Sequence, residues 1–480
     1  MKSIRKFAAP LLSSVMLFVA ACGGGGDSGG GTTTPPTVGI DGGGFSSGTI
    51  TGFGSVIVNG VRFSTTTAAI TIDGRSGASE SELKVGQVVE VRGRFDSNGT
   101  TGTATTITFN DSTEGPVSAV DTVAGTLVVL GQTVRVNGAT VFDDRFTTPS
   151  LAGIAVGSVV EVSGFRNAAG EIVATRIEPK AAGGTFELTG TVSALDTTNR
   201  RFNIGATVIN YANVTPTDGT LSNGGCAEAK GTAFAGGALT ATSVEVKSCG
   251  PTGANDDVAE VEGLITRFVS ATDFDVGSQR VTTTGTTTYE NGVVGDLRVG
   301  LKVEAEGRLN ASGLLTARKV QIKPDTSLRL LGTVDSLDAA AGTLRVFGLT
   351  VSTGAITAYE DKSSANIRQF RFADLRTGDY LEVRGFAGTT ANTLVAARIE
   401  RDDLDSRREI QGVAASPATA PNLTIFGISV STAGAQYRNE AGASITQAAF
   451  FAAAGNRLVK VRGSWNGSSF TATEAELENF

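Results

Sequence analysis

A short segment that returns six times constrains this chain more than any other feature of its sequence. The first copy, Leu83–Gly93, reads LKVGQVVEVRG, a glycine-marked turn followed by an alternating strand. Val89 and Val91 are expected on one face of that strand, and Glu90 and Arg92 on the other. The other copies end, at intervals of roughly 67 to 78 residues, at Gly164, Gly231, Gly307, Gly385 and Gly463. Repetition at a nearly constant period indicates a tandem array of structural units.

The second repeat, residues 114–180, shows the plan of one unit most clearly. Its segments GPVSAVD, GTLVVLG, QTVRVNGATVF, VVEVSGF and IVATRIE predict five strands. The intervening SLAGIAVG predicts a short helical turn between the third and fourth strands. This layout favours a small OB-like barrel, and an SH3-like barrel is the competing fold.

We therefore expect an all-β chain of about six such five-stranded barrels, each with a short helical turn between strands three and four. Residues 365–375 and 445–454 lengthen that connection and favour helices of two or three turns. The predicted boundaries are a lipoprotein signal peptide at 1–21, a flexible Gly/Thr/Pro tether at 22–45, and barrels at 46–110, 114–180, 185–250, 258–324, 327–401 and 408–480.

The N-terminus has the features of an export signal. Three basic residues precede the apolar run Phe7–Ala21, which is short for a membrane span. The run ends in Val-Ala-Ala followed by Cys22, which resembles the lipobox of bacterial lipoproteins. That resemblance implies that Cys22 becomes the acylated, palmitate-bearing first residue and anchors the chain in a membrane. Gly23 replaces the aspartate that retains many lipoproteins at the inner membrane, so the outer membrane is expected in an organism with two membranes.

Composition excludes several classes of function. The chain has no histidine, which rules out a Ser-His-Asp hydrolase and a histidine-ligated zinc site. Its formal charge of −7 argues against nucleic acid as a partner. The acidic run at 401–409 lacks the glycine and closing glutamate of an EF-hand loop. No metal site and no cofactor are therefore predicted.

Two cysteines, Cys226 and Cys249, remain besides Cys22. An even number in an exported chain favours a disulfide between them. A regular hairpin would place Glu245 opposite Cys226, so the chain must fold back to bring Cys249 close.

The repeats also share a wider set of motifs, G-x-V-x-x-(V/L)-D, T-L-x-V-x-G-x-x-V-x-V, L-x-x-G-x-x-V-E-V-x-G and A-T-R-I-E. The second and fifth repeats carry them at Val117–Asp121, Thr126–Val136, Leu151–Gly164, Ala174–Glu178, Val334–Asp338, Thr343–Val351, Leu375–Gly385 and Ala397–Glu400. Together they resemble a bacterial family known as domain of unknown function 5666. The third and sixth repeats depart most, with Ala227 and Ala229 in place of valines and Lys460 in place of the glutamate. The resemblance implies exported tandem β domains and supplies no activity.

Aromatic side chains are the candidates for ligand contact. An aromatic residue beside a charged one recurs after the third strand, and one tryptophan lies near a predicted hairpin tip. The candidates are Phe142, Tyr289, Tyr359, Tyr437 and Trp465. Stacking on such rings could hold a sugar, but each aromatic is more simply interpreted as a plug for one end of its small barrel.

Opposite charges are predicted to face each other across the last hairpin of four repeats. Regular hairpin register pairs Glu161 with Arg176, Glu304 with Lys319, Glu382 with Arg398, and Lys460 with Glu474. Such exposed pairs would fix the register and add little stability.

These observations favour a non-enzymatic, lipid-anchored cell-envelope protein whose repeated barrels have a structural or ligand-binding role. Its expected partners are the membrane and a glycan or an envelope protein. The alternative is a carboxylate-dependent enzyme that processes envelope glycans. Such an enzyme would need one cleft with an acid pair rather than six nearly equivalent small domains.

Overall fold

The structure, a computed structural model, describes residues 42–323, 326, 328–388, 390, 392–440 and 442–478. The predicted signal peptide, Cys22 and the predicted tether up to residue 41 lie outside the described residues. The chain divides into two units, Met1–Thr37 and Val38–Phe480, and the elements below belong to the second. Across the described ranges, none of the helices has the length and apolar character of a membrane span.

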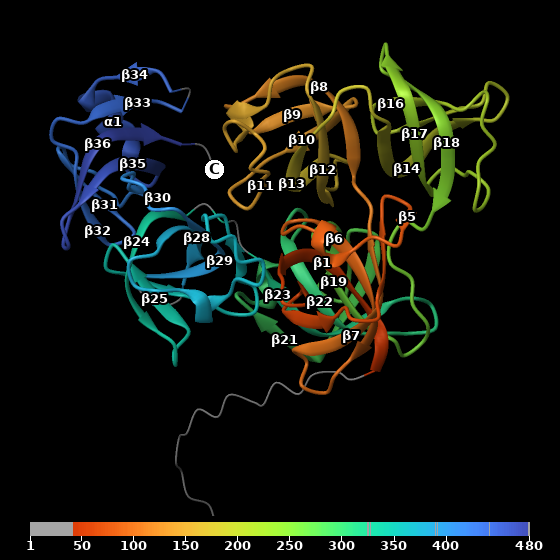
Figure 1. The fold of residues 1–480 in the computed structure, drawn as a ribbon, viewed down its shortest axis with the longest axis horizontal. Helices are drawn as coiled ribbons and strands as arrows, with labels where there is room; N and C mark the ends of the chain where they lie inside the picture. The colour runs from red at the N-terminus through yellow and green to blue at the C-terminus, as the bar shows by residue number, and fades with distance from the viewer. Residues whose placement is uncertain are drawn as a thin grey trace, which may run out of the picture. The chain divides into compact units, whose positions relative to one another are not determined.

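The described residues form three sheets (Figure 1). The first has 12 strands and contains the first and fourth repeats: β1 (Gly42–Gly52), β2 (Val56–Val58), β3 (Val61–Ser64), β4 (Ala69–Ile72), β5 (Arg75–Ser76), β6 (Val88–Phe95), β7 (Thr101–Phe109), β19 (Val258–Ser270), β20 (Asp273–Val276), β21 (Gln279–Glu290), β22 (Lys302–Leu309) and β23 (Leu315–Ile322).

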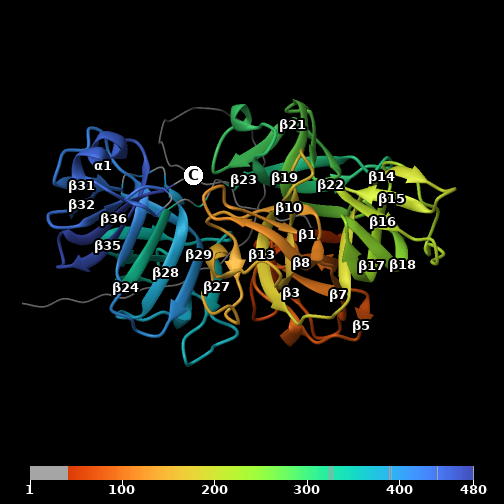
Figure 2. The ribbon, with the colours of Figure 1, turned by 90° about the horizontal axis from the view of Figure 1, so that it is seen from above.

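The second sheet has 11 strands and contains the second and third repeats, which are orange to yellow-green in Figure 2. Its strands are β8 (Thr113–Asp121), β9 (Thr126–Val129), β10 (Gln132–Arg135), β11 (Val141–Phe142), β12 (Val159–Arg166), β13 (Ile172–Lys180), β14 (Phe186–Asp196), β15 (Arg201–Ile204), β16 (Thr207–Asn210), β17 (Cys226–Ala235) and β18 (Ala238–Lys247).

The third sheet has 13 strands and contains the fifth and sixth repeats. Its strands are β24 (Leu328–Asp338), β25 (Thr343–Val346), β26 (Leu349–Ser352), β27 (Ala358–Asp361), β28 (Tyr380–Ala387), β29 (Thr393–Asp402), β30 (Glu409–Val413), β31 (Asn422–Ile425), β32 (Ile428–Ser431), β33 (Gln436–Arg438), β34 (Ser444–Ile445), β35 (Leu458–Trp465) and β36 (Phe470–Leu477).

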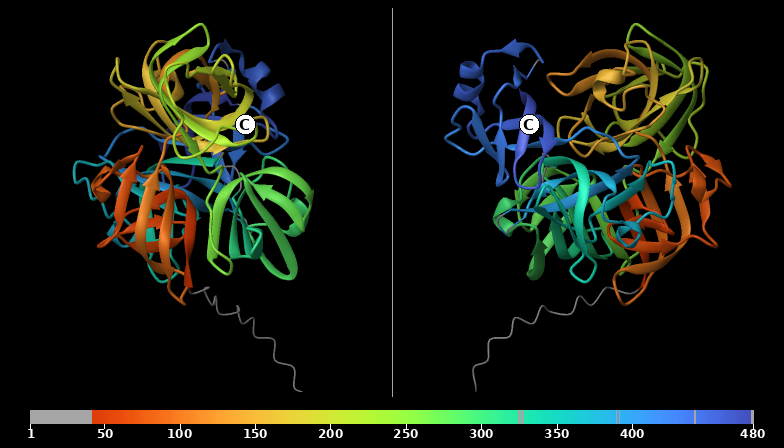
Figure 3. Two further views of the ribbon diagram at one scale, coloured as in Figure 1. Left: turned by 90° about the vertical axis from the view of Figure 1, so that its right-hand side faces the viewer. Right: turned by 60° about the vertical axis from the view of Figure 1, so that its left-hand side comes forward.

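Each sheet contains a closed five-stranded barrel plus extra strands. In the second repeat, β8 pairs with β9, β9 with β10, β10 with β13, β13 with β12, and β12 again with β8. Only β10 and β13 run parallel, and the result is an OB-like Greek-key barrel. Figure 3 shows the strands of the repeats curving round common centres. The alternation of the sequence is the cause, because Leu127, Val129 and Val134 point inward and pack with Val160 and Val162.

The last hairpin of every repeat carries a β-bulge at the closing glycine of the recurrent segment. A Cβ on Gly93 would lie 2.0 Å from the carbonyl oxygen of Thr103, and one on Gly164 would lie 2.4 Å from that of Val173. Backbone approaches this close leave no room for a side chain. The six glycines are therefore the residues that allow the bulge.

The bulge, together with a turn centred later than predicted, makes the predicted charge pairs wrong by two positions. In the structure, Glu161 lies opposite Glu178, Glu304 lies opposite Gln321, Glu382 lies opposite Glu400, and Lys460 lies opposite Glu476. The predicted partners Arg176, Lys319, Arg398 and Glu474 are therefore not the direct ones. A shift of two keeps every side chain on its predicted face. Lys319 still reaches Glu304 diagonally, with 3.7 Å between Nζ and Oε1.

The helical connections differ from the prediction. Single 3₁₀ turns precede the fourth strand in four repeats, at Glu80–Glu82, Leu151–Gly153, Val294–Asp296 and Phe372–Asp374. The sixth repeat has the helix α1 (Gln447–Ala454), whereas the helix expected at 365–375 is reduced to its 3₁₀ turn. The described residues between β16 and β17 contain no helical turn.

The predicted tether also extends too far. Residues 42–45 belong to β1, which pairs in parallel with β19, and Phe45 is fully buried. A Cβ on Gly44 would lie 1.9 Å from the carbonyl oxygen of Val258. Gly44 therefore permits close packing of two strands, a purpose that composition alone does not distinguish from flexibility.

Candidate functional site: a buried acidic junction

The candidate aromatics do not form an exposed rim. Phe142, Tyr289, Tyr359 and Trp465 are partly buried against the cores, and Tyr437 is buried. The ring centroid of Trp465 lies 5.7 Å from that of Phe347, so the tryptophan covers the contact between the fifth and sixth repeats. The structure thus packs these residues against the barrel cores, which is the position that the plug interpretation expects.

The charged neighbours of these aromatics are bound by the last hairpins. Asp143 pairs with Arg176, Glu360 with Arg398, and Arg438 with Glu474. Glu290 accepts a hydrogen bond of 2.8 Å from Gln321 Nε2. The aromatic–charged pattern in the sequence is therefore explained by barrel closure.

The predicted charge-pair residues are more buried than expected. Glu161, Arg176, Glu304 and Arg398 are each below 10% exposed. Their hairpin faces pack against other repeats. For example, Arg176 donates a hydrogen bond of 3.1 Å to the carbonyl oxygen of Val85 in the first repeat. Charges on these faces consequently lie in a poorly hydrated environment where pairing matters.

A disulfide joins Cys226 and Cys249, the pair that the sequence predicts, with 5.1 Å between their Cα atoms. Lys247 lies opposite Cys226 in the ladder, and the chain turns back beyond it. The bridge ties the end of β18 to the start of β17 in the third repeat.

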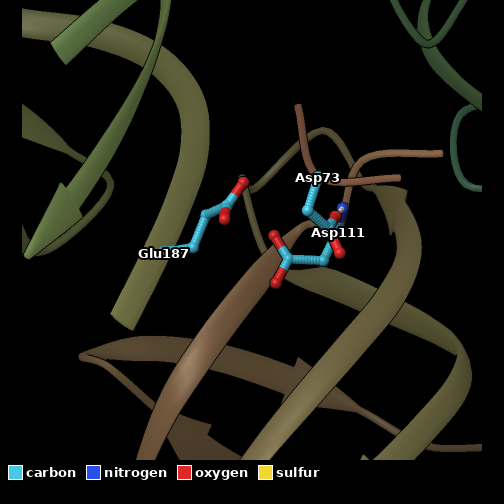
Figure 4. A group of neighbouring side chains, drawn as sticks. All are labelled: Asp73, Asp111 and Glu187. Carbon is cyan, nitrogen blue, oxygen red and sulfur yellow. Dashed lines mark hydrogen bonds between the residues drawn. The ribbon is translucent and has the colours of Figure 1, made fainter. Parts of the chain in front are cut away.

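Acidic side chains from three repeats meet where β8 pairs with β14. We call this cluster the acidic junction, and it contains Asp73, Asp111, Glu114, Glu161 and Glu187 with Lys180 and Lys230. Carboxylate oxygens of Asp73, Asp111 and Glu187 lie within 4.8 Å of one another. Figure 4 shows the Asp111 carboxylate pointing toward that of Glu187, with Asp73 beside it.

The backbone positions these groups from separate segments. Asp73 lies in the turn between β4 and β5, Asp111 in the link between β7 and β8, and Glu187 on β14. The amide of Asp111 donates a hydrogen bond of 3.0 Å to Asp73 Oδ1. Glu187 lies directly opposite Glu114 across the ladder. Like charges at directly opposed positions repel each other, so the pairing concentrates negative charge.

Two lysines partly neutralise the acidic junction. Lys180 pairs with Glu161, and its Nζ lies 3.0 Å from Glu114 Oε2. Lys230 Nζ lies 2.7 Å from Glu187 Oε2 and 3.2 Å from an oxygen of Glu228, and it donates to the carbonyl oxygen of Asp73 at 3.0 Å. Five carboxyl groups thus share two ammonium groups, one of which also serves Glu228.

Burial raises the pKa values of four carboxyl groups in the junction, and neighbouring carboxylates raise them further; the four are Asp73, Asp111, Glu161 and Glu187. Burial raises the pKa of Asp111 well above its ordinary range, and Glu187, Asp73, Glu161 and Glu114 raise it further. Burial and the Glu228 carboxylate raise the pKa of Glu187 to about 8, although Lys230 opposes this. Burial likewise raises the pKa of Glu161 to about 7 against the effect of Lys180.

Some of these oxygens have no hydrogen-bond partner among the described residues. They are both carboxylate oxygens of Asp111, which is 2% exposed, and Oε1 of Glu187, which is 6% exposed. Buried polar atoms are nearly always satisfied in folded proteins. The sequence predicts no metal site, yet the fold gathers an oxygen-only donor set of the type that hard cations prefer.

The family model for a domain of unknown function (DUF5666) matches residues 47–108, 114–178, 262–321 and 332–400. These four matches cover more than half of the chain. The chain belongs to this family. The matched DUF5666 ranges do not include the third and sixth repeats, where the motifs depart most. In the third repeat the strand order of the barrel nevertheless recurs as β14, β15, β16, β18 and β17.

Other comparisons add little. No curated protein matches the chain. Among solved structures, the one titled "drosophila Unr CSD456" is similar to it, with 14% sequence identity, coverage of 44% of this chain and 96% of that chain, and a TM-score of 0.13. A TM-score this low supports no argument about fold or function.

Proposed function

We propose that the protein is a non-enzymatic, lipid-anchored protein of the cell envelope, in which six OB-like barrels form a joined scaffold. The observation that carries this proposal is the joining of the repeats. The first repeat pairs with the fourth, the second with the third, and the fifth with the sixth through main-chain ladders.

One hollow of about 200 Å³ is lined by residues that include Ser47, Glu90 and Asn110. Small-molecule sites usually enclose about 300–1,000 Å³. The carboxylates of Asp111 and Glu187, which lie within 4.8 Å of each other, are too buried to reach a polysaccharide. The glycan-processing alternative therefore has less support than a scaffold that binds a glycan or an envelope protein at its surface.

The proposed anchor is the lipid on Cys22, and the outer membrane is the proposed location where an organism has two membranes. Cys22→Ser in the full chain is expected to abolish palmitate labelling and to move the protein from the membrane to the soluble fraction. Cys249→Ser is the matched control, because Cys249 is also a cysteine but follows no lipobox, and it is expected to remain in the membrane fraction. Membrane retention of the Cys22 variant would contradict the anchor.

The scaffold role is tested with the purified full chain on an array of envelope glycans and cell-wall fragments. Saturable binding without release of shortened products is the expected result. Catalytic turnover of any fragment would instead establish the enzymatic alternative.

A further inference from the structure

We propose that Asp73, Asp111 and Glu187 are the protein ligands of a calcium ion that joins the first, second and third repeats. The proposal goes beyond the scaffold function and does not depend on the lipid anchor. It starts from the buried oxygens of Asp111 and Glu187 that have no partner in the described part of the chain.

The geometry suits one cation between these three side chains. Oxygens bound to a common calcium at about 2.4 Å can be at most about 4.8 Å apart. The three carboxylates meet this limit, and Figure 4 shows the Asp111 and Glu187 groups directed toward each other. A second triad, Asp111 with Glu114 and Glu161, is equally compact, but Lys180 already pairs with both glutamates. The first triad therefore has the greater unmet demand for positive charge.

A comparison within the chain supports a cation at this place. In the pairing of β24 with β30, Leu331 lies opposite Glu409, just as Glu114 lies opposite Glu187 in the pairing of β8 with β14. Two residues before Leu331 stands Arg329, whose guanidinium binds both Glu382 and Glu409. Two residues before Glu114 stands Ser112, which brings no charge.

The glutamates themselves are the same in both places. Glu382 and Glu161 occupy the same position in the recurrent segment, as do Glu409 and Glu187 in the first strands of their repeats. The second cation is also retained, because Arg462 binds Glu409 as Lys230 binds Glu187. The shared Arg329 is replaced by Ser112, and Arg384, which also binds Glu382, is replaced by Ser163. Lys180 is added beside Glu161, and the carboxylates of Asp73 and Asp111 are added there as well. An external cation would restore the balance that Arg329 supplies internally.

The donor set selects the ion. It contains carboxylate oxygens and neither imidazole nor thiolate, which disfavours zinc and copper. The ligands come from three separate segments, and calcium accepts such irregular sets of six to eight oxygens, with water completing the shell, whereas magnesium demands a near-ideal octahedron. Neutralisation by a proton on Asp111 is the competing explanation, and the test below separates the two.

The test is calorimetric titration of the chelator-treated full chain with calcium chloride, and with magnesium chloride in parallel. We expect one saturable calcium site with a dissociation constant at or below about 1 mM, and weaker or no binding of magnesium. Asp111→Asn is expected to lower the calcium affinity about tenfold or more, because it removes the central charged ligand while preserving size. Ser112→Arg is expected to abolish binding by providing the internal cation.

Ser118→Arg is the matched control, because it adds the same charge six residues further along, at an exposed position on β8. It is expected to bind calcium like the wild type. Circular dichroism in chelator checks that each variant folds, and Glu187→Gln replaces Asp111→Asn if the latter does not. Absence of calcium binding up to about 10 mM, above the range of extracellular calcium modules, would overturn the proposal. So would unchanged binding by the folded Asp111 or Glu187 variant, or a preference for magnesium.

Discussion

Two contacts between neighbouring repeats have the same backbone arrangement and a different balance of charge. In the contact between the fifth and sixth repeats, Arg329, Arg384 and Arg462 are paired with Glu382 and Glu409, and we call this cluster the arginine junction. In the acidic junction, the position of Arg329 is taken by Ser112, and unpartnered oxygens remain. Similar ladders can therefore be closed by internal cations or left with a deficit of positive charge.

The two contacts also differ in the side chains that pack beside the charged groups. Phe347 packs against Trp465 and Phe470 in the arginine junction, with centroids 5.7 and 5.6 Å apart. Beside the acidic junction, Gln132 Nε2 donates to the carbonyl oxygen of Ile204 at 2.9 Å and to Thr207 Oγ1 at 2.8 Å. One contact thus includes aromatic packing and paired charge, and the other includes hydrogen bonds and carboxylates beside its apolar core. We expect the former to be stable on its own and the latter to respond to ions and pH.

The largest expected effect comes from removing the shared guanidinium. Arg329→Ser should leave Glu382 and Glu409 buried without their common partner and should cost about 3–5 kcal/mol of local stability. Trp465 is the only tryptophan in the chain and lies in this contact, so its fluorescence during urea unfolding reports on the arginine junction. Arg345→Ser, at an exposed position, is the control and should change little. A similar loss in both variants would contradict the role of Arg329.

The aromatic contact should contribute less than the guanidinium. Trp465→Ala removes the ring that covers Phe347, and we expect a cost of about 2 kcal/mol, below the range for a fully buried tryptophan because Trp465 is only partly buried. Hydrogen exchange of β25, β26 and β36 measures the change. Leu404→Ala, at a residue that is 73% exposed in the following linker, should leave this exchange unaltered. Faster exchange confined to the sixth repeat would show that Trp465 does not connect the two repeats.

These residues mark the limits of prediction from the sequence. The period of the repeats, the alternation of each strand and the turn glycines depend on local residues, and they predict the OB-like barrel and the inward face of each strand. Register is less local. The glycine that ends each recurrent segment favours a bend or a close backbone approach, but it does not specify a bulge. The bulge contributes to moving the partner of Glu161 from Arg176 to Glu178.

The acidic junction could not be predicted for a further reason. Asp73 and Asp111 resemble ordinary polar residues of a turn and a link, and they approach Glu187 only because the repeats pack together. The pairing of β1 with β19 likewise joins the first repeat to the fourth, which no nearest-neighbour argument anticipates. One signal was present in the sequence. Aligning Gly115 with Gly332 places Ser112 where the fifth repeat has Arg329, and this comparison reveals a missing charge once the contacts are known.

The two junctions should respond oppositely to pH in chelator. Burial and neighbouring carboxylates raise the pKa of Glu187 to about 8. Its contribution to the free energy of unfolding is therefore complete below about pH 4.5 and is lost as the pH rises through 8. Although burial opposes it, Arg384 and Arg329 lower the pKa of Glu382, so its contribution is present above about pH 4.5 and is lost only in acid. Hydrogen exchange of β14 should therefore show a loss of about 1–2 kcal/mol between pH 5 and pH 8, and β28 should show none.

The groups that face Glu187 are Asp73, Asp111 and Glu114, with Glu228 and Lys230 on β17. Glu187→Gln removes the titrating group and should flatten the pH response of β14. If that variant keeps the full wild-type slope between pH 5 and pH 8, another group is responsible for it. Equal slopes for β14 and β28 in the wild type would remove the difference between the two junctions.

The smallest expected effect comes from giving the acidic junction the residue that the arginine junction has. Ser112→Arg loses a weak hydrogen bond from the Ser112 hydroxyl to the carbonyl oxygen of Gly164, at 3.2 Å, and places a guanidinium near Glu161 and Glu187. Charge-assisted hydrogen bonds contribute about 1.5–3 kcal/mol, so after the lost bond and the cost of ordering the side chain we expect a net gain of about 1 kcal/mol in chelator. Hydrogen exchange of β8 and β14 measures it, with Ser118→Arg as the control that should show no gain.

Repeating the measurement in calcium shows where the new arginine acts. In saturating calcium the wild-type junction should already be neutralised, so the advantage of Ser112→Arg over the wild type should disappear, while Ser118→Arg follows the wild type in both conditions. A stabilisation of the same size with and without calcium would mean that the arginine acts somewhere other than the carboxylates. If Ser112→Arg is less stable than the wild type in chelator, Asp111 holds a proton and the junction has no deficit of positive charge. Ser112 and Arg329 would then be equivalent in backbone position alone.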